Sequence, residues 1–243
     1  MVQGIRRYDR PVGPFDANLA QRVPEPPLME AHDQARAYSE ADFAAAHEAI
    51  VDDVVRRHPD LGRGEGLHVV DLGCGPADVT VRLARRLPDA RVLGLDAGPV
   101  MLGLARARIY AHGLGSTVTV ARAHLPDVDE GLRGRFGLVV SNSLLHHLED
   151  PSALWSSVAA LAAPGAAVHV ADLCRPDDAA TLDALVTRYA SGEPEVLVED
   201  FRNSLAAAHR PDEVRAQLAA AGLDALQVAV ISDRHLVVWG RLA

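Results

Sequence analysis

Residues 69–78 of the chain have the sequence VVDLGCGPAD, and this short stretch decides the fold. An apolar run ends at Leu72, Gly73 and Gly75 mark a turn, and an amphipathic stretch begins at Asp78. The pattern predicts a buried strand that passes into a helix through a glycine turn. In open α/β sheets, ligands bind beyond the carboxyl ends of the strands, so we expect this turn to contact a ligand.

The residues around the turn limit the kind of ligand. A dinucleotide site has the pattern G-x-G-x-x-G, but Asp78 occupies the third glycine position and would repel a pyrophosphate. A P-loop requires a lysine, and the chain has none. Asp71, at the strand end, instead suits a positively charged group such as the ammonium of an amino acid. Asp96 ends the next strand, where a carboxylate can accept both hydroxyls of a ribose. S-adenosylmethionine carries both groups.

Strands and helices alternate along most of the chain. The fold class predicted from this alternation is α/β, a Rossmann-like, doubly wound, mostly parallel seven-stranded sheet with an antiparallel C-terminal hairpin strand and an N-terminal helical cap. The expected strands are 67–72, 91–95, 118–121, 136–141, 166–170, 226–231 and 235–239. The expected helices include 78–87, 99–112, 151–161 and 211–221. We expect residues 1–66 to form a lid or cap segment, and 67–243 the ligand-binding domain with a substrate-side insertion at 173–210.

At this point the sequence resembles the class I S-adenosylmethionine-dependent methyltransferases. Residues 71–75 (DLGCG) resemble their first motif, Asp96 their second, and residues 136–148 (FGLVVSNSLLHHL) their fourth-strand motif. The resemblance implies a Rossmann-like domain that binds S-adenosyl-L-methionine and methylates a small molecule. It assigns the cofactor to the following residues: Asp71, Gly73, Gly75, Asp96, Ala97, Met101 and Asn142. The chain departs from the family at Ala77, where a third glycine is common, and after the third strand, where an adenine-binding acid is common.

Candidate catalytic residues follow the fourth and fifth strands. An alcohol or carbon acceptor must lose a proton, and His146, His147 and Asp172 are the groups at the active edge that can take it. The simpler interpretation is that the histidines brace a helix and that Asp172 pairs locally with Arg175. We expect Arg175 and Tyr38 to contact the substrate, although Tyr38 also fits a place in the core. No metal is expected at the site.

Composition narrows the class of partner. The formal net charge of −9 is a poor match to nucleic acid, and no apolar run approaches the length of a membrane helix. The two cysteines, Cys74 and Cys174, form no disulfide framework and no zinc site. We therefore expect a cytoplasmic enzyme with a small-molecule substrate and without nucleic-acid or membrane partners. A homodimer is possible, and the sequence does not decide the oligomeric state. The alternatives are a homologue that binds the cofactor for regulation, a methyltransferase for macromolecules and a nicotinamide-dependent reductase.

The N-terminal segment is rich in proline and carries several of the few aromatic residues. Solvated tails are usually poor in aromatic residues, and a proline-rich chain loses less entropy when it becomes ordered. We expect residues 1–45 to form an ordered lid over the cofactor, and a disordered tail is the alternative. The aromatic residues of this segment are Tyr8, Phe15, Tyr38 and Phe43.

Overall fold

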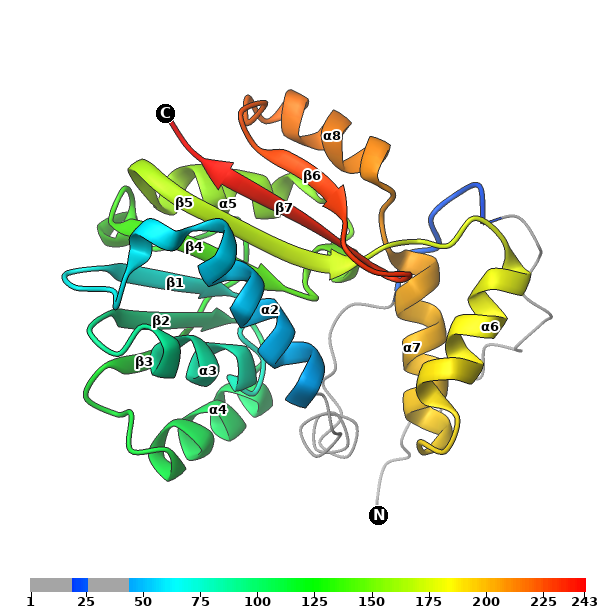
Figure 1. Ribbon diagram of the computed structural model, residues 1–243, viewed down its shortest axis with the longest axis horizontal. Helices are drawn as coiled ribbons and strands as arrows, with labels where there is room; N and C mark the ends of the chain where they lie inside the picture. The colour runs from blue at the N-terminus through cyan, green and yellow to red at the C-terminus, as the bar shows by residue number, and fades with distance from the viewer. Residues whose placement is uncertain (1–18, 26–43) are drawn as a thin grey trace, which may run out of the picture.

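A seven-stranded sheet forms the centre of the computed structural model, which describes residues 19–25 and 44–243 (Figure 1). The strand order is β3-β2-β1-β4-β5-β7-β6. The strands are β1 (His68–Leu72), β2 (Arg91–Asp96), β3 (Val118–Arg122), β4 (Phe136–Asn142), β5 (Ala162–Leu173), β6 (Gln227–Val230) and β7 (His235–Arg241). The predicted fold class is confirmed. The fifth strand is longer than expected, because it begins directly after the preceding helix ends.

Only β7 runs against the other strands. It lies between β5 and β6 and is antiparallel to both, whereas β1 to β5 pair in parallel. The predicted link at 232–234 makes this reversal possible, and it is closed by a 2.9 Å hydrogen bond from the Ile231 N–H to the His235 carbonyl. All five parallel strands consequently end at one edge of the sheet, where the ligand site is expected.

Helices cover both faces of the sheet. On one face lie α2 (Ala44–Arg57), α3 (Asp78–Arg86) and α4 (Pro99–Ala111), whose buried side chains share a core with β1, β2 and β4. On the other face lie α5 (Ser152–Leu161) and α8 (Pro211–Ala220). Sequence signals explain several helix ends: Pro99 occupies the first turn of α4, and Gly113, with φ +67°, follows its end.

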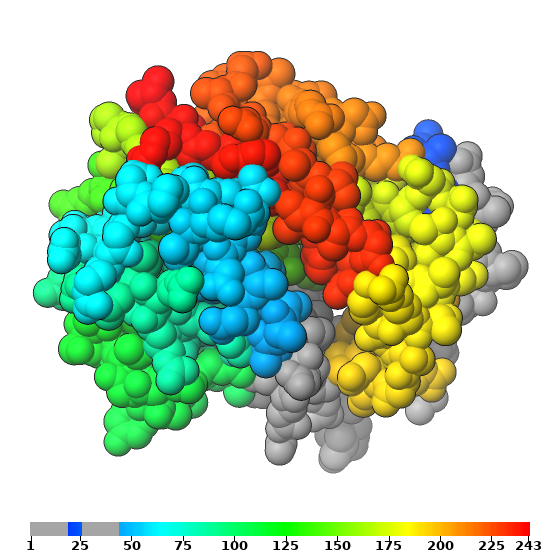
Figure 2. All heavy atoms as spheres, viewed as in Figure 1, coloured from blue at the N-terminus to red at the C-terminus, as the bar shows by residue number. Residues whose placement is uncertain are grey.

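The expected insertion at 173–210 contains two helices, α6 (Ala179–Ala190) and α7 (Glu195–Ala207), which lie side by side beyond the ends of β5 and β7 (Figure 1). Figure 2 shows β7 passing between α2, in blue, and the α6–α7 pair, in yellow. Leu19 packs into the small core of α6, α7 and the end of β5. The described parts of the predicted segment 1–66 therefore pack in different places. Residues 19–25 contact α7, whereas α2 covers one face of the sheet.

Several expectations concern residues outside those that the structure describes. They include the aromatic residues Tyr8, Phe15 and Phe43 and the expected substrate residue Tyr38. Within the described ranges, every helix is too short or too polar to cross a membrane.

A buried histidine in β5 makes the stability of the fold depend on pH. His169 is 1% exposed, and neither ring nitrogen has a hydrogen-bond partner among the described residues. Burial lowers the pKa of His169 to about 3, although the nearby Asp53 opposes this shift. The unfolded chain, with an ordinary histidine pKa near 6.5, therefore binds a proton that the folded protein does not.

We predict that the free energy of unfolding falls as the pH falls from about 6.5, and that His169 contributes about 1.4 kcal/mol of this loss per pH unit. Urea titrations between pH 6 and 4 measure the slope. In His169→Gln the slope should decrease by about that amount, because the titrating group is gone. The exposed His112→Gln is the control. An unchanged slope in His169→Gln would show that another group causes the acid sensitivity.

Candidate active site

A cavity of about 340 Å³ opens at the carboxyl edge of the sheet, between the ends of β1, β2 and β4. All the residues expected to bind the cofactor line it, together with one of the three expected catalytic residues. These residues are Asp71, Gly73, Gly75, Asp96, Ala97, Met101, Asn142 and His147. Parallel pairing brings them together, because Asp71 and Leu72 of β1 lie in register with Gly94 and Leu95 of β2.

The turn after β1 strongly favours glycine at its first position. Gly73 has φ +70°, and a Cβ there would lie 2.7 Å from a Leu144 methyl carbon. Gly75 has φ +52°, and a Cβ there would meet no protein atom within 4 Å. Because Gly75 lines the cavity, its missing side chain leaves room for a ligand to approach the backbone.

Ala77, the departure from the family pattern, lies behind the turn. It is fully buried in the core of α2, α3 and β1 and does not line the cavity, so its methyl group does not reduce the space for a ligand. It does adopt φ +63°, a conformation that glycine adopts more readily. The alanine therefore affects the backbone rather than the cavity.

Asp71 has an unusual environment for a carboxylate. It is 2% exposed, and the Thr80 hydroxyl donates a 2.6 Å hydrogen bond to its Oδ2. Burial raises the pKa of Asp71 to about 7, the Thr80 hydrogen bond opposes the shift, and the charge of Asp96 adds to it. Near neutral pH this group is poised between its two forms, and a cation in the cavity would favour the ionised one.

Asp96 fixes two loops at the same time. Its Oδ2 accepts a 2.8 Å hydrogen bond from the Gly75 N–H, and its Oδ1 accepts a 2.7 Å bond from the Gly98 N–H. Each carboxylate oxygen can accept further bonds, so both remain able to receive the hydroxyls of a ribose. Burial raises the pKa of Asp96, and the two backbone donors oppose the rise.

The far end of the cavity is mainly apolar. Met101, Ala123 and Leu125 line it, as does the backbone around Ala97. Arg122, the last residue of β3, is exposed and donates to the Ala97 carbonyl, and it does not line the cavity. A flat aromatic base can pack here without the acid that many family members place after the third strand.

Asp78 explains why a pyrophosphate would not bind at this turn. It begins α3 and lines the cavity, where a dinucleotide would place its phosphates. His47 and Arg82 both pair with its Oδ2, at 2.6 and 2.9 Å, and Arg108 lies 3.3 Å from Oδ1. The hydrogen bond from His47 lowers the pKa of Asp78 far below its usual range, so the helix terminus is already occupied by a negative charge.

Asp172 and His146 form a buried pair behind the cavity wall. Asp172 is 2% exposed and accepts hydrogen bonds from the Leu145 N–H, the Leu173 N–H and His146 Nδ1, at 2.6, 2.6 and 2.5 Å. Burial alone would lower the pKa of His146, but the charge and hydrogen bond of Asp172 outweigh it and raise the pKa. Neither residue lines the cavity, and together they hold the short helix η3 (Leu145–His147) against β5.

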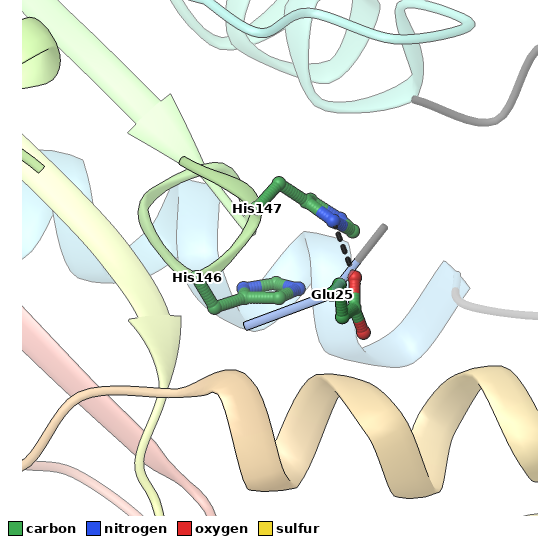
Figure 3. A group of neighbouring side chains, drawn as sticks. All are labelled: Glu25, His146 and His147. Atoms are coloured by element: carbon green, nitrogen blue, oxygen red, sulfur yellow. Dashed lines mark ion pairs between the residues drawn. The ribbon is translucent and has the colours of Figure 1, made fainter. Parts of the chain in front are cut away.

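His147 lines the cavity, and its side chain is held by Glu25, a residue outside the sheet. Its Nδ1 lies 2.6 Å from Glu25 Oε2 (Figure 3). Ser204 of α7 donates to Glu25 Oε1 at 2.6 Å. Arg22 adds bonds to the carbonyls of His146, Leu148 and Ala207. Residues 19–25, which we call the strap, thus fasten η3 to α7. Sequence patterns gave no signal for Glu25 or Arg22, because both lie in an irregular proline-rich segment.

Arg175 lies away from the cavity. Its guanidinium is fully buried and donates to the Leu19 and Ala208 carbonyls and to both carboxylate oxygens of Glu213. This placement joins the strap to α8 and gives no support to the expected contact with substrate. The expected local pair between Asp172 and Arg175 is replaced by separate pairs, Asp172 with His146 and Arg175 with Glu213.

Comparison with known proteins assigns the superfamily. The family described as "Methyltransferase domain" matches residues 69–165, which run from β1 into β5. The chain is also similar to a solved SAM-dependent methyltransferase from Aquifex aeolicus, with a TM-score of 0.63, 15% identity, and coverage of 88% of this chain and 99% of that one. The chain belongs to the class I S-adenosylmethionine-dependent methyltransferase superfamily.

Curated relatives in this superfamily carry names of enzymes that act on small molecules. The chain is 38% identical over 103 residues to trans-aconitate 2-methyltransferase of Methylobacterium radiotolerans, covering 42% of this chain and 36% of that protein. It is 33% identical over 184 residues to the Methylobacterium nodulans enzyme of the same name, covering 71% and 66%. The chain thus spans about one third and just under two thirds of the lengths of these two relatives.

The raised pKa of Asp71 has a measurable consequence for the binding of a ligand that carries an ammonium group. We predict that S-adenosylhomocysteine, which carries an ammonium group, binds with release of protons as Asp71 ionises: about 0.9 per chain at pH 6 and about 0.1 at pH 8. Affinity should therefore increase with pH up to about 7 and then level off. Calorimetry in buffers with different ionisation enthalpies counts the protons.

The variant Asp71→Asn should abolish this proton release, and the exposed Asp127→Asn should leave it intact. The same release from Asp71→Asn as from the native protein would assign the proton to another group and remove Asp71 from the ammonium site.

Proposed function

We propose that the protein transfers the methyl group of S-adenosyl-L-methionine to a small-molecule acceptor. The observation that carries the proposal is the combination in one cavity of Asp71, Asp96 and the glycine turn between them. Asp71 would hold the amino-acid ammonium, Asp96 the ribose, and the apolar end around Met101 the adenine. When bound, the cofactor supplies a sulfonium methyl group that an acceptor can displace directly.

His147 is the catalytic residue in this proposal. Of His146, His147 and Asp172, it alone lines the cavity, and it lies on the same wall as Asn142, which would flank the amino-acid end of the cofactor. Asp172 and His146 act on its position, because they fix the backbone of η3. The strap acts from the other side through Glu25. The rest of the enzyme aligns the acceptor and excludes water, which is the main requirement of a direct displacement.

The relatives suggest the scale of the acceptor. Some relatives are named for methylation of trans-aconitate, and others for an O-methylation in ubiquinone biosynthesis. Neither name refers to a macromolecule. We propose an acceptor of comparable size for this chain, placed in the cavity beside His147. The acidic net charge of −9 favours such an acceptor over nucleic acid.

Incubation with methyl-labelled S-adenosylmethionine and a fractionated metabolite extract tests the proposed transfer. We expect a product that carries the label and is heavier than its precursor by one methyl group. Label that stays on the cofactor, although S-adenosylhomocysteine binds, would favour the alternative of a cofactor-binding regulator.

With the acceptor in hand, we predict that His147→Asn lowers kcat by at least about 100-fold and changes the S-adenosylhomocysteine Kd by less than about twofold. The reason is that His147 contacts the reacting groups but not the determinants that hold the cofactor. The exposed His112→Asn is the control and should retain full turnover. Unchanged kcat in His147→Asn would leave alignment of the acceptor as the whole mechanism.

A further inference from the structure

Three groups able to bind a metal converge beside the cavity, and His147 is the one of the three that lines it. They are Glu25 of the strap and His146 and His147 of η3, and Figure 3 shows both imidazole rings directed toward the Glu25 carboxylate. One ligand atom from each lies within 4.8 Å of the other two. The residues come from segments more than 100 positions apart, so the cluster is created by the fold rather than by a local sequence pattern.

Two of these groups, His146 and Glu25, are oriented by a partner on the side away from the cluster. Asp172 accepts the Nδ1–H of His146 at 2.5 Å, which leaves Nε2 as the ring atom available for another contact. Ser204 donates to Glu25 Oε1 at 2.6 Å, which leaves Oε2 directed at His147. Histidine ligands of metals usually have such a carboxylate on the second ring nitrogen, and it fixes the tautomer and the ring.

The charges around the cluster also favour a cation. Glu25 and Asp172 are nearly buried, with side-chain exposures of 10% and 2%. Arg22 is the nearby cation, and its guanidinium donates to three backbone carbonyls rather than to either carboxylate. With both imidazoles neutral, as metal ligands must be, the two carboxylates outweigh the one guanidinium and leave a net negative charge in a partly desolvated place.

We propose that Glu25, His146 and His147 bind a divalent transition-metal ion. Two imidazoles and one carboxylate suit Zn²⁺, Fe²⁺ or Co²⁺. With bonds of about 2.0–2.2 Å, a tetrahedral ion holds neighbouring ligand atoms about 3.4 Å apart. Glu25 Oε2 and His147 Nδ1, now 2.6 Å apart, share a proton, and the ion replaces that proton as the pair opens by less than 1 Å. This inference replaces our sequence-based expectation that the site holds no metal.

The position of the ion would deepen the proposed function, on which this part of the inference rests. Three protein ligands leave at least one coordination position open, and His147 places it beside the cavity. An oxygen of the acceptor, such as that of a phenol, an enol or a hydroxy acid, would take this position. The ion would lower the pKa of the acceptor oxygen, and the proton of that oxygen would pass to solvent. In this arrangement His147 would be a ligand of the ion.

Titration of the full-length, tag-free and EDTA-dialysed protein with Co²⁺ tests the site without any substrate. We expect one ion per chain, a visible d–d absorption band and displacement by Zn²⁺. Glu25→Gln keeps the shape of the side chain but loses the charge, and should weaken binding at least tenfold. His147→Gln, on the partly exposed side of the cluster, should do the same. Glu199→Gln, an exposed change on α7, is the control and should bind like the native protein.

Two results would overturn the proposal: no Co²⁺ band in the native protein, or equal affinity in the native protein and both cluster variants. Calorimetry with S-adenosylhomocysteine on the same samples separates this failure from that of the proposed function. A protein that binds S-adenosylhomocysteine but no Co²⁺ sinks the metal site alone. A protein that binds Co²⁺ but not S-adenosylhomocysteine keeps the metal site and sinks the methyltransferase proposal.

Discussion

The site depends on the hydrogen bonds that tie the glycine turn to the end of β2. The Gly73 and Cys74 N–H groups both donate to the Leu95 carbonyl, at 2.8 and 3.0 Å, and the Gly75 N–H donates to the Asp96 carboxylate. These bonds fold the turn back over the neighbouring strand. The bonds thus fix the turn beside the ends of β1 and β2, where strand pairing brings Asp71 and Asp96 to one cavity.

A second set of contacts holds η3, and with it His147, beside the cavity. Asp172, at the end of β5, holds η3 through the Leu145 N–H and His146, and the strap holds it from α7 through Arg22 and Glu25. Segments outside the common sheet therefore fix His147, the expected catalytic residue that lines the cavity. Function in such folds resides in sites added to a common sheet, and here the added parts are the strap and the α6–α7 pair.

The sheet, and the convergence of the expected cofactor residues on one cavity, could be predicted from sequence because their signals are local. Apolar runs mark β1, β2 and β4, and each expected cofactor residue lies at or just beyond a strand end. The roles of His146 and His147 could not be separated, because adjacent residues in a tight turn give no sign of which one faces the cavity. The expected contact of Arg175 with the substrate finds no support in the structure, for a related reason. Its charge suggested a ligand, whereas its partner is Glu213, 38 positions away, in a contact that only the fold creates.

The central claim is that the acid–glycine–acid arrangement binds an aminoacyl-nucleoside rather than a dinucleotide. Calorimetric titration of the native protein and Asp96→Ala with S-adenosylhomocysteine and with NAD tests it most directly. The account predicts low-micromolar or tighter binding of S-adenosylhomocysteine, no binding of NAD, and a loss of about 1.5–3 kcal/mol in Asp96→Ala, since a charged acceptor of hydroxyl groups is removed. Tight binding of NAD, or unchanged S-adenosylhomocysteine affinity in a folded Asp96→Ala protein, would contradict it.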